Sequence, residues 1–375
     1  MRRPIVIYRD VLLAPSETFV RAQAEALVSF EPHYVGSRRA PGLELPEART
    51  TVINHGTSLG RVRELAHKSV GLAPALTRQL RTLAPALVHA HFGPDGTLAL
   101  PLARRMGAPL IVTFHGYDAT MHDDALARGS WAGRAYVRRR ARLWREASRV
   151  LAVSEFVRQK LEALGCPPER LRVHYTGIDT GFYRPAPEMA RRPLVLFVGR
   201  LMEVKGCQYL LRAMLRVQAE VPDAHVVVIG DGPLRDGLEA FARAELEQVC
   251  FLGMQPPEVV RAWMNRARVF CVPSVTTESG ATEGFGLVFA EAQAMGVPVA
   301  GFASGGVPEA VAHGETGLLV PEREVEQLAD AITCLLRDTA LWQQFSTAGQ
   351  RRVQERFNLA RQTERLEELY REVAL

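Results

Sequence analysis

The chain has 375 residues, of which 47% are hydrophobic and 23% are charged, and it contains no low-complexity tract. This composition is that of a globular protein. The chain is longer than the domains that usually form around a single hydrophobic core, so two domains are expected. The net charge of +5 is uneven, because residues 1–190 carry 27 Lys and Arg against 17 Asp and Glu, whereas residues 191–375 carry 19 against 24.

Three observations predict a cytoplasmic protein. The five cysteines are widely spaced, odd in number and without a C-x-x-C pair, which argues against a disulfide framework and a structural zinc site. The N-terminal MRRPIVIYRD has an apolar run shorter than the ~7–15 residues of a signal peptide. No apolar stretch approaches the ~18–20 residues of a membrane span.

Apolar strands alternate with stretches of helical period along the whole chain. Near-continuous Val, Ile and Leu in such strands predict parallel sheets that are covered by helices on both faces. The predicted strands are 4–9, 86–92, 109–116, 149–154, 193–200, 224–232, 249–253, 268–274 and 298–302, with a helix at 208–220 and an amphipathic helix at 361–375.

The segment 176–193 is rich in Gly and Pro and lacks apolar periodicity, which predicts an interdomain linker. The predicted fold is therefore α/β, with two doubly wound Rossmann-like domains facing a central cleft. We place the domains at residues 1–184 and 185–357, and we expect the helix 358–375 to cross back to the first domain.

The basic segment RAYVRRRARLWRE, residues 134–146, holds much of the positive excess. It fits a solvated helix face, an anionic membrane surface or an anionic acceptor. Nucleic acid is not expected as a partner, since no nucleic-acid-binding module is recognised. Arginines and aromatics alternate around Tyr136–Trp144, so this helix could lie on a membrane surface.

Two cations follow the predicted strand that ends at Gly199. Arg200 and Lys205 lie in the loop at its carboxyl end, where a doubly wound sheet binds ligands. A guanidinium and a mobile ammonium suit a diphosphate, although basic residues after a strand also occur without a ligand. The next strand ends in GDGPLRDG, where Gly230 allows close backbone approach, but Arg235 occupies the third glycine position of a dinucleotide fingerprint.

The segment EGFGLVFAE, 283–291, predicts a loop that enters a helix. Gly284 and Gly286 leave backbone amides uncovered at the helix start, which is an anion site. Glu283 and Glu291 flank that site with seven residues between them. Each alone could be a capping acid or a solvated one, but carboxylates on both sides of a diphosphate site suit the hydroxyls of a nucleotide sugar.

Histidines and acids follow two strands of the first half. His115 and Asp118 lie in TFHGYD, and His91 and Asp95 lie in HAHFGPDG. A histidine at a strand end is often structural, but these four side chains are also candidates for lining the ligand pocket.

The chain resembles the retaining glycosyltransferases of family 4, which have the GT-B fold. The resemblance spans nearly the whole chain and is strongest over 195–320, through GRLMEVKG, GDGPLRDGLE, FLG, EGFGLVFAEAQAMGVPVAGFASGGVPEAV and GETGLLVP. The resemblance implies catalytic roles for His115, Arg200, Lys205 and Glu283, with Glu283 and His115 at the donor sugar and Arg200 and Lys205 at the diphosphate. It also implies a ribose contact for Glu291 and a nucleobase near Met254, with Gly199, Gly230, Gly284, Phe285, Gly286 and Leu287 lining the nucleotide site. No metal or other cofactor is implied.

The first βα loop departs from the Gly-Gly pattern of many family members. It reads APSETFV, residues 14–20, which resembles the exopolysaccharide branch of colanic-acid and amylovoran transferases. Ser16 and Glu17 are therefore acceptor-side candidates together with His91, Asp95 and Asp118. Glu17 could act as a general base, but the resemblance implies front-face attack assisted by the leaving phosphate instead.

The sequence thus predicts a retaining hexosyltransferase of bacterial surface polysaccharide assembly. Its donor would be a UDP- or GDP-linked sugar, and its acceptor a saccharide or polyprenyl-linked saccharide. Peripheral contact with the inner membrane through the basic first domain is also expected. The alternatives are a nucleotide-sugar epimerase of the same architecture and a non-catalytic nucleotide-sugar-binding relative.

Overall fold

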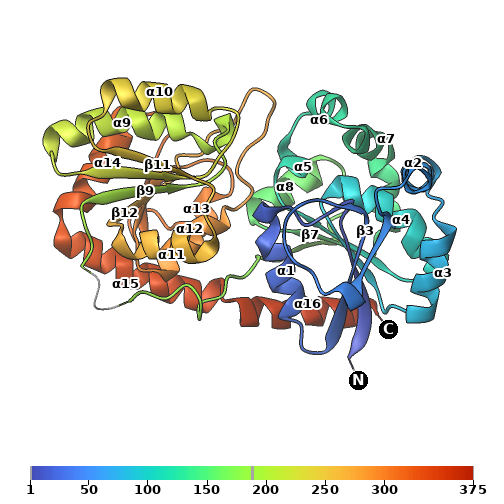
Figure 1. Ribbon diagram of the computed structural model, residues 1–375. Coiled ribbons are helices and arrows are strands. Elements are labelled where there is room, and N and C mark those ends of the chain that lie inside the picture. Colours follow the sequence, from blue (N-terminus) through green and yellow to red (C-terminus); the bar gives the residue numbers. More distant parts are fainter. Residues whose placement is uncertain (1, 187–189, 375) are drawn as a thin grey trace. The chain divides into compact units, whose positions relative to one another are not determined.

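The computed structural model describes residues 2–186 and 190–374, which divide into two compact units (Figure 1). Unit 1 comprises Met1–Gly177 and Leu359–Leu375, and unit 2 comprises Ile178–Asn358. The first crossing between the units lies at Gly177, earlier than the predicted boundary after residue 184. Most of the predicted linker that the structure describes therefore belongs to unit 2.

Unit 1 is built on an eight-stranded sheet of parallel strands. Their order is β2-β3-β1-β5-β6-β7-β8, and β4 pairs with β3. The strands are β1 (Arg3–Tyr8), β2 (Val11–Leu12), β3 (Phe30–Arg39), β4 (Thr50–Asn54), β5 (Val88–His91), β6 (Leu110–Phe114), β7 (Arg149–Ala152) and β8 (Leu171–Val173). Starting from the central strands β1 and β5, the chain adds strands outward in both directions, which is the doubly wound arrangement.

Unit 2 repeats this arrangement with six parallel strands in the order β11-β10-β9-β12-β13-β14. The strands are β9 (Leu194–Val198), β10 (His225–Ile229), β11 (Val249–Gly253), β12 (Val269–Cys271), β13 (Val299–Phe302) and β14 (Gly317–Val320). The predicted α/β class with two doubly wound domains is confirmed. Strands β2, β3, β4, β8 and β14 were not predicted.

The helices of unit 1 are α1 (Thr18–Glu25), α2 (Ser58–Val70), α3 (Pro74–Leu83), α4 (Gly93–Met106), α5 (Tyr117–Thr120), α6 (Asp123–Gly129), α7 (Trp131–Glu146), α8 (Glu155–Ala163) and α16 (Leu359–Val373). Those of unit 2 are α9 (Cys207–Glu220), α10 (Arg235–Glu245), α11 (Pro257–Arg266), α12 (Leu287–Ala294), α13 (Val307–Ala310), α14 (Val325–Arg337) and α15 (Thr339–Arg356). Short 3₁₀ turns lie at Pro15–Glu17, Glu47–Arg49 and Glu203–Lys205. No helix of the described residues is long and apolar enough to cross a membrane.

The C-terminal helix α16 is a structural part of unit 1. Its Leu366 and Tyr370 are fully buried in the cluster formed by α1 and by one face of the sheet. The Tyr370 hydroxyl lies 2.6 Å from Nδ1 of His89. The Glu367 carboxylate accepts the backbone N–H groups of Val28 and Ser29 at 2.6 and 2.7 Å. The helix therefore closes one face of the sheet with both apolar and polar contacts.

Helix α4 covers the opposite face, and two glycines let it lie close to the sheet. A Cβ atom on Gly96 would be 2.8 Å from the side chain of Val112, and one on Gly93 would be 2.4 Å from Phe114. Larger residues would push the helix outward. The close approach holds Asp95, between these glycines, directly beyond the end of β5.

The two aromatic residues of helix α7 that were predicted to lie on a membrane surface are buried. Tyr136 and Trp144 are 0% and 4% exposed, and both rings pack with Phe114. The prediction that this mixture of arginines and aromatics lies on a membrane surface is therefore wrong for these two residues. Most of the arginines of the helix are exposed, as is Trp131 at its start.

We predict that Tyr370→Ala lowers the free energy of unfolding of unit 1 by about 3–5 kcal/mol, because it leaves a large cavity. Tyr370→Phe should cost about 1–3 kcal/mol, since it leaves a buried nitrogen of His89 without its partner. The measurement is urea denaturation, read from the transition of unit 1. Exposed Glu368→Ala on the same helix is the control, and an equal effect of Tyr370→Ala and Glu368→Ala would contradict the prediction.

Candidate active site

The central site of unit 2 lies where the strand order reverses, beside β9 and β12. Helices α9 and α12, which follow these two strands, lie on opposite faces of the sheet (Figure 1). The loops that leave the two strands therefore meet at the sheet edge without a helix over them, and this is where doubly wound sheets bind ligands. Apart from His115, which follows β6 in unit 1, the predicted donor-side residues follow β9, β10, β11 or β12.

An ion pair joins the two loops. Nζ of Lys205, after β9, lies 2.5 Å from Oε2 of Glu283, after β12, and both side chains are largely buried. The Ser274 hydroxyl donates to the same carboxylate oxygen at 3.3 Å. The structure thus brings together a predicted diphosphate ligand and a predicted sugar ligand that are 78 residues apart in the sequence.

Close backbone packing fixes the position of this pair. A Cβ atom on Gly206, which has φ +67°, would lie 1.8 Å from the carbonyl oxygen of Pro273. The Gly306 N–H, after β13, donates to the Glu283 carbonyl at 2.9 Å. Because only glycine fits at these contacts, the loops are held together by main chain rather than by side chains.

Helix α12 begins at the predicted position. Gly286 is its N-cap, with φ +80°, and no side chain caps the helix, so Glu283 is not a capping acid. Leu287 is the first helical residue, and Phe285 is buried against Phe357. The loop from Gly284 to Gly286 thus presents amide donors of the kind that bind anions.

Glu291 lies on α12 and is not an exposed acid. Burial raises its pKa to about 7, and a hydrogen bond with Tyr183 acts in the opposite direction. Tyr183 is partly buried, and this and the Glu291 carboxylate raise its pKa above the ordinary value. A carboxyl group with so high a pKa carries a proton for part of the time at neutral pH.

Four further donor-side candidates lie at strand ends. Gly199 and Gly230 lie against each other, since a Cβ atom on Gly230 would be 1.9 Å from the Gly199 carbonyl oxygen. Arg200 is exposed, and within the described ranges its side chain makes no hydrogen bond or ion pair. Met254 is 66% exposed directly after β11. Arg200 is therefore accessible but is not brought into the Lys205–Glu283 pair.

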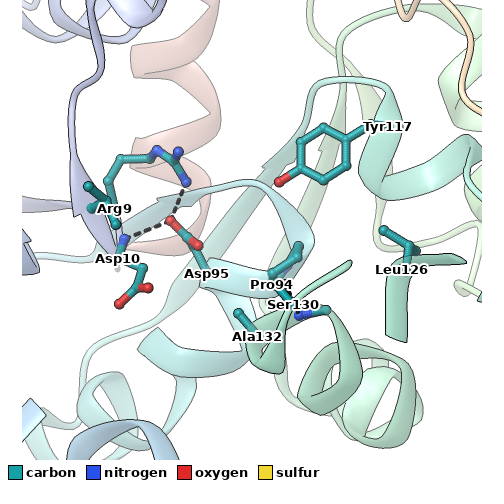
Figure 2. A pocket seen from close by; sticks show the side chains of 10 residues that line it. Arg9, Asp10, Pro94, Asp95, Tyr117, Leu126, Ser130 and Ala132 are labelled. Atoms are coloured by element: carbon teal, nitrogen blue, oxygen red, sulfur yellow. Dashed lines mark hydrogen bonds and ion pairs between the residues drawn. The ribbon is translucent and has the colours of Figure 1, made fainter. Parts of the chain in front are cut away.

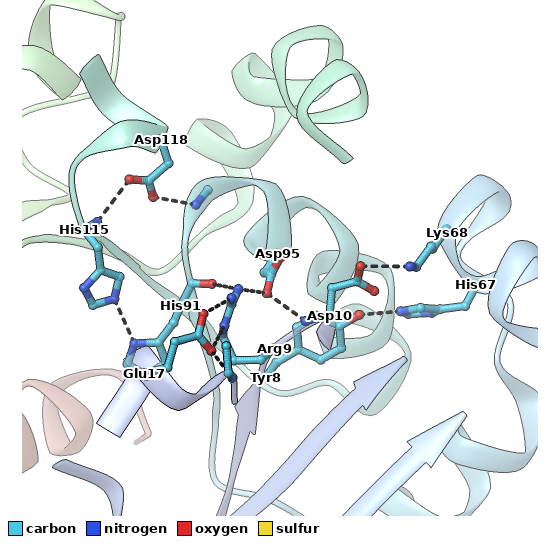
Figure 3. Close-up of polar contacts among 12 residues, drawn as sticks. Tyr8, Arg9, Asp10, Glu17, His67, Lys68, His91, Asp95, His115 and Asp118 are labelled. Carbon is cyan, nitrogen blue, oxygen red and sulfur yellow. Dashed lines mark hydrogen bonds and ion pairs between the residues drawn. The ribbon is translucent and has the colours of Figure 1, made fainter. Parts of the chain in front are cut away.

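Unit 1 has a corresponding site beside β1 and β5, centred on Arg9. Nη2 of Arg9 lies 2.5 Å from Oε1 of Glu17, and the guanidinium also contacts Asp95 (Figure 3). It packs over the Phe92 ring at 4.4 Å. Burial lowers the pKa of Arg9, but Asp95 and Glu17 outweigh this effect and raise it above its ordinary value.

The acids around Arg9 are linked to a second pair. The Asp95 carboxylate accepts the Asp10 N–H at 2.7 Å, and Oδ2 of Asp10 lies 2.8 Å from Nζ of Lys68. Burial raises the pKa of Asp95 to about 6, although Arg9 opposes this rise. Oδ1 of Asp10 is buried, and in the described part of the chain it has no hydrogen-bond partner.

A cavity of about 140 Å³ opens beside these acids (Figure 2). Its polar lining comes from Arg9, Asp10, Asp95 and Tyr117, and its apolar lining includes Leu126. Carboxylates, a guanidinium and a half-exposed aromatic ring together suit a polyhydroxylated ligand such as a sugar.

The remaining candidates of unit 1 differ in their surroundings. His91 Nδ1 and His115 Nε2 are 3.0 Å apart, and burial lowers the pKa of both imidazoles well below the ordinary value, so they are neutral. Asp118 accepts the N–H groups of Gly93, His115 and Gly116, which fixes the loop after β6. Ser16 is exposed, and no hydrogen bond of its side chain is found among the described residues.

Sequence reasoning missed Arg9, Asp10, Lys68, Tyr117 and Tyr183. Arg9 and Asp10 directly follow a buried strand, which is the same signal that identified Arg200 and Lys205. Lys68 lies on α2, and Tyr183 lies in the segment interpreted as a linker, so no local pattern marks them.

The fold is the GT-B fold of glycosyltransferases. The solved structure of Anabaena Alr3699/HepE in complex with UDP and glucose superposes with a TM-score of 0.77 over 99% of this chain and 100% of that one, at 20% identity. Sucrose-phosphate synthase from Thermosynechococcus elongatus gives 0.77 over 99% of each chain, at 24% identity.

The chain belongs to the family 4 glycosyltransferases. Residues 16–182 match "Glycosyltransferase Family 4", and residues 192–338 match "Glycosyl transferases group 1". A GDP-mannose-dependent alpha-(1-6)-phosphatidylinositol monomannoside mannosyltransferase of Mycobacterium tuberculosis is 31% identical over 74% of both chains.

A second relative supports the exopolysaccharide resemblance. The putative colanic acid biosynthesis glycosyltransferase WcaL of Salmonella typhimurium is 32% identical over 64% of this chain. The match covers 59% of that relative, so the chain spans about three fifths of its length.

The high pKa of Glu291 predicts a pH-dependent stability. An acid whose folded-state pKa is about 7 keeps a proton that the unfolded chain releases near 4.5, so its contribution to stability falls as pH rises from 4.5 to 7. Glu291→Gln removes this decline, and the variant should gain on the order of 2–3 kcal/mol relative to wild type across that window. Urea denaturation at several pH values measures the difference.

Glu258→Gln, an exposed acid of α11, is the matched control and should show no such trend. A difference between Glu291→Gln and wild type that stays constant with pH would contradict the assignment.

Proposed function

We propose that the protein is a retaining, metal-independent hexosyltransferase. It transfers a sugar from a UDP- or GDP-linked donor to a saccharide or lipid-linked saccharide in bacterial surface polysaccharide biosynthesis. The observation that carries the proposal is the Lys205–Glu283 pair at the point in unit 2 where the strand order reverses. It sets a phosphate-binding cation beside a hydroxyl-binding carboxylate, as a nucleotide-sugar site requires.

In this proposal the diphosphate lies at the start of α12. Lys205, exposed Arg200 and the amides of Gly284–Gly286 offset the negative charge that develops on the leaving nucleoside diphosphate. A diphosphate would replace Glu283 as the partner of Lys205, which frees the carboxylate for the donor sugar. Glu291 accepts from a ribose hydroxyl, and the nucleobase lies toward Met254.

Metal independence rests on the same charges. Lys205, Arg200 and the helix start supply what a divalent cation would supply to the phosphates. Retention follows from attack on the same face that the diphosphate leaves, so the departing phosphate takes the acceptor proton. Neutral His115 is the proposed contact of the donor sugar in unit 1.

The relatives support a nucleotide sugar as the donor, and they are compatible with either uracil or guanine as its nucleobase. One structural relative was solved with UDP and glucose, and one sequence relative is named as GDP-mannose-dependent. The colanic acid relative supports the pathway. A cytoplasmic enzyme at the inner membrane would meet a polyprenyl-linked acceptor there.

The cavity beside Arg9 is the proposed acceptor subsite. Asp10 and Asp95 are the acids of its lining, and Tyr117 offers a ring on which a sugar can stack. Glu17 neutralises Arg9 and is not the base.

Glu283→Gln should lower turnover by about 10²-fold, because the lost carboxylate contacts the sugar in the transition state. Its dissociation constant for UDP or GDP should stay within about threefold, whereas Lys205→Met should weaken that binding about 10–100-fold. Calorimetry and a sugar-transfer assay measure the two effects.

Glu278→Gln, an exposed acid of the same loop, is the control and should behave as wild type. Full activity of Glu283→Gln would contradict the proposal. Interconversion of the donor sugar without any acceptor would indicate an epimerase, and binding without either reaction would indicate a non-catalytic relative.

Asp10→Asn should raise the KM for the acceptor about tenfold or more, with hydrolysis of the donor in the absence of acceptor unchanged. The reason is that the carboxylate oxygen that receives an acceptor hydroxyl is replaced by a poorer partner. Asp124→Asn, on exposed α6, is the control. An unchanged acceptor KM in Asp10→Asn would remove the cavity from the acceptor site.

A further inference from the structure

Unit 2 has a cavity of about 470 Å³ between helices α9 and α10. The two helices pack side by side on one face of the sheet, because the crossovers from β9 to β10 and from β10 to β11 run in the same direction (Figure 1). Helix α12, where the donor diphosphate is proposed to lie, is on the other face, and none of the residues described around the cavity is a donor-side candidate. The cavity is therefore separate from the donor site, and its size suits a small organic ligand.

Apolar and charged side chains share the lining of this cavity. Leu234, Leu238 and Phe241, at the start of α10 and along it, form an apolar wall. Leu234 is 38% exposed, and Phe241 is half-buried. Glu203 and Arg212 also line the cavity, and both are exposed. Among the described residues neither side chain forms a hydrogen bond or an ion pair, so both charges are available to a ligand.

A glycine keeps part of this space open. Gly237 lines the cavity and lies inside α10, where glycine is less favourable than alanine. A Cβ atom at this position would meet no atom within 4 Å, and the φ angle of Gly237 is not in the left-handed region. Neither close packing nor backbone conformation therefore requires glycine here, whereas a ligand in the cavity would occupy the space that a side chain would fill.

We infer that the cavity between α9 and α10 is a second nucleotide site, distinct from the donor site. A flat nucleobase suits the wall formed by Leu234, Leu238 and Phe241, because aromatic and aliphatic side chains pack against its faces. The Glu203 carboxylate accepts hydrogen bonds from ribose hydroxyls, and the Arg212 guanidinium pairs with a phosphate. A free sugar fits less well, since it would leave much of the apolar wall uncovered.

A short turn connects this cavity to the donor site. Glu203 and Lys205 belong to the same 3₁₀ turn, and the Gly206 N–H donates to the Glu203 carbonyl oxygen at 3.0 Å. The Leu234 N–H donates to the Leu201 carbonyl oxygen at 3.1 Å, which holds the start of α10 against the loop after β9. A nucleotide bound to Glu203 therefore acts on the turn that carries Lys205, and the two sites are coupled.

The test is isothermal titration calorimetry of the full chain with UDP and, separately, with GDP. Besides the site that Lys205→Met weakens, at least one of these nucleotides should show a second site. Arg212→Gln should weaken binding at the second site about tenfold or more, because the charged hydrogen bonds to phosphate are lost. Gly237→Leu should abolish that binding, since the leucine side chain fills the cavity.

Arg243→Gln is the matched control, because Arg243 is an exposed arginine of α10 outside the cavity, and it should bind both nucleotides as wild type does. Arg212 and Gly237 are exposed, and leucine favours a helix more than glycine, so neither variant should lower the thermal midpoint. Nucleotide binding that is unchanged in Arg212→Gln and in Gly237→Leu overturns the inference. A cavity that binds methyl glucoside, and no nucleotide, in a manner sensitive to Gly237→Leu also overturns it, in favour of a sugar site.

The calorimetric test does not depend on sugar transfer, so it separates this inference from the proposed function. A site that needs Arg212 without one that needs Lys205 would contradict the proposed donor site and leave the second site in place, and the reverse result would contradict the second site alone. The coupling rests on the proposed function. In transfer assays the nucleoside diphosphate product should give mixed inhibition against the donor for wild type and competitive inhibition for Gly237→Leu, and competitive inhibition of both would overturn the coupling.

Discussion

In each unit the strand order reverses beside the first strand, and the rest of the site follows from that reversal. Consecutive crossovers on the two sides of the reversal run to opposite faces, so the two central loops meet with no helix between them. In unit 1 Arg9 lies in the loop after β1 and Asp95 in the first turn of α4 after β5, and in unit 2 the two loops carry Lys205 and Glu283. Each reversal thus places a cation from one loop against a carboxylate from the other.

The two pairs differ in how firmly each cation is held. Arg9 lies between two carboxylates, a backbone carbonyl and the Phe92 ring, so separating it from them would leave buried charges unpaired. Lys205 has one carboxylate partner and a flexible side chain, and exposed Arg200 lies five residues before it. In the proposed site a phosphate would therefore replace Glu283 as the partner of Lys205 at low cost, whereas the contacts of Arg9 would stay in place.

Much of the fold could be predicted because nine buried strands are continuous apolar runs. Strand β3 was not predicted because FEPHYVGSRR contains a proline, a glycine and three charged residues. It is a strand because β1, β2 and β4 pair with it. The donor-side residues could be found because they are local to strand ends. The contacts of Asp10 with Lys68 and of Glu291 with Tyr183 join distant segments, and no single-sequence pattern encodes such pairs. The periodic spacing of the apolar residues of α2 is visible in the sequence. Which face of the helix points outward depends on contacts between distant residues, such as the Lys68–Asp10 ion pair.

Helix α2 supports the proposed acceptor cavity of unit 1. Its inner side chain Lys68 holds Asp10, and the Asp10 N–H is held in turn by Asp95, so both acids of that cavity depend on where this helix lies. His67 adds a second contact on the same face, since its Nε2 lies 2.7 Å from the Tyr8 hydroxyl. The polar face of α2 therefore packs inward and leaves Leu59, Val62 and Leu65 exposed, which is unfavourable for a helix in water but holds the acids of the cavity in place.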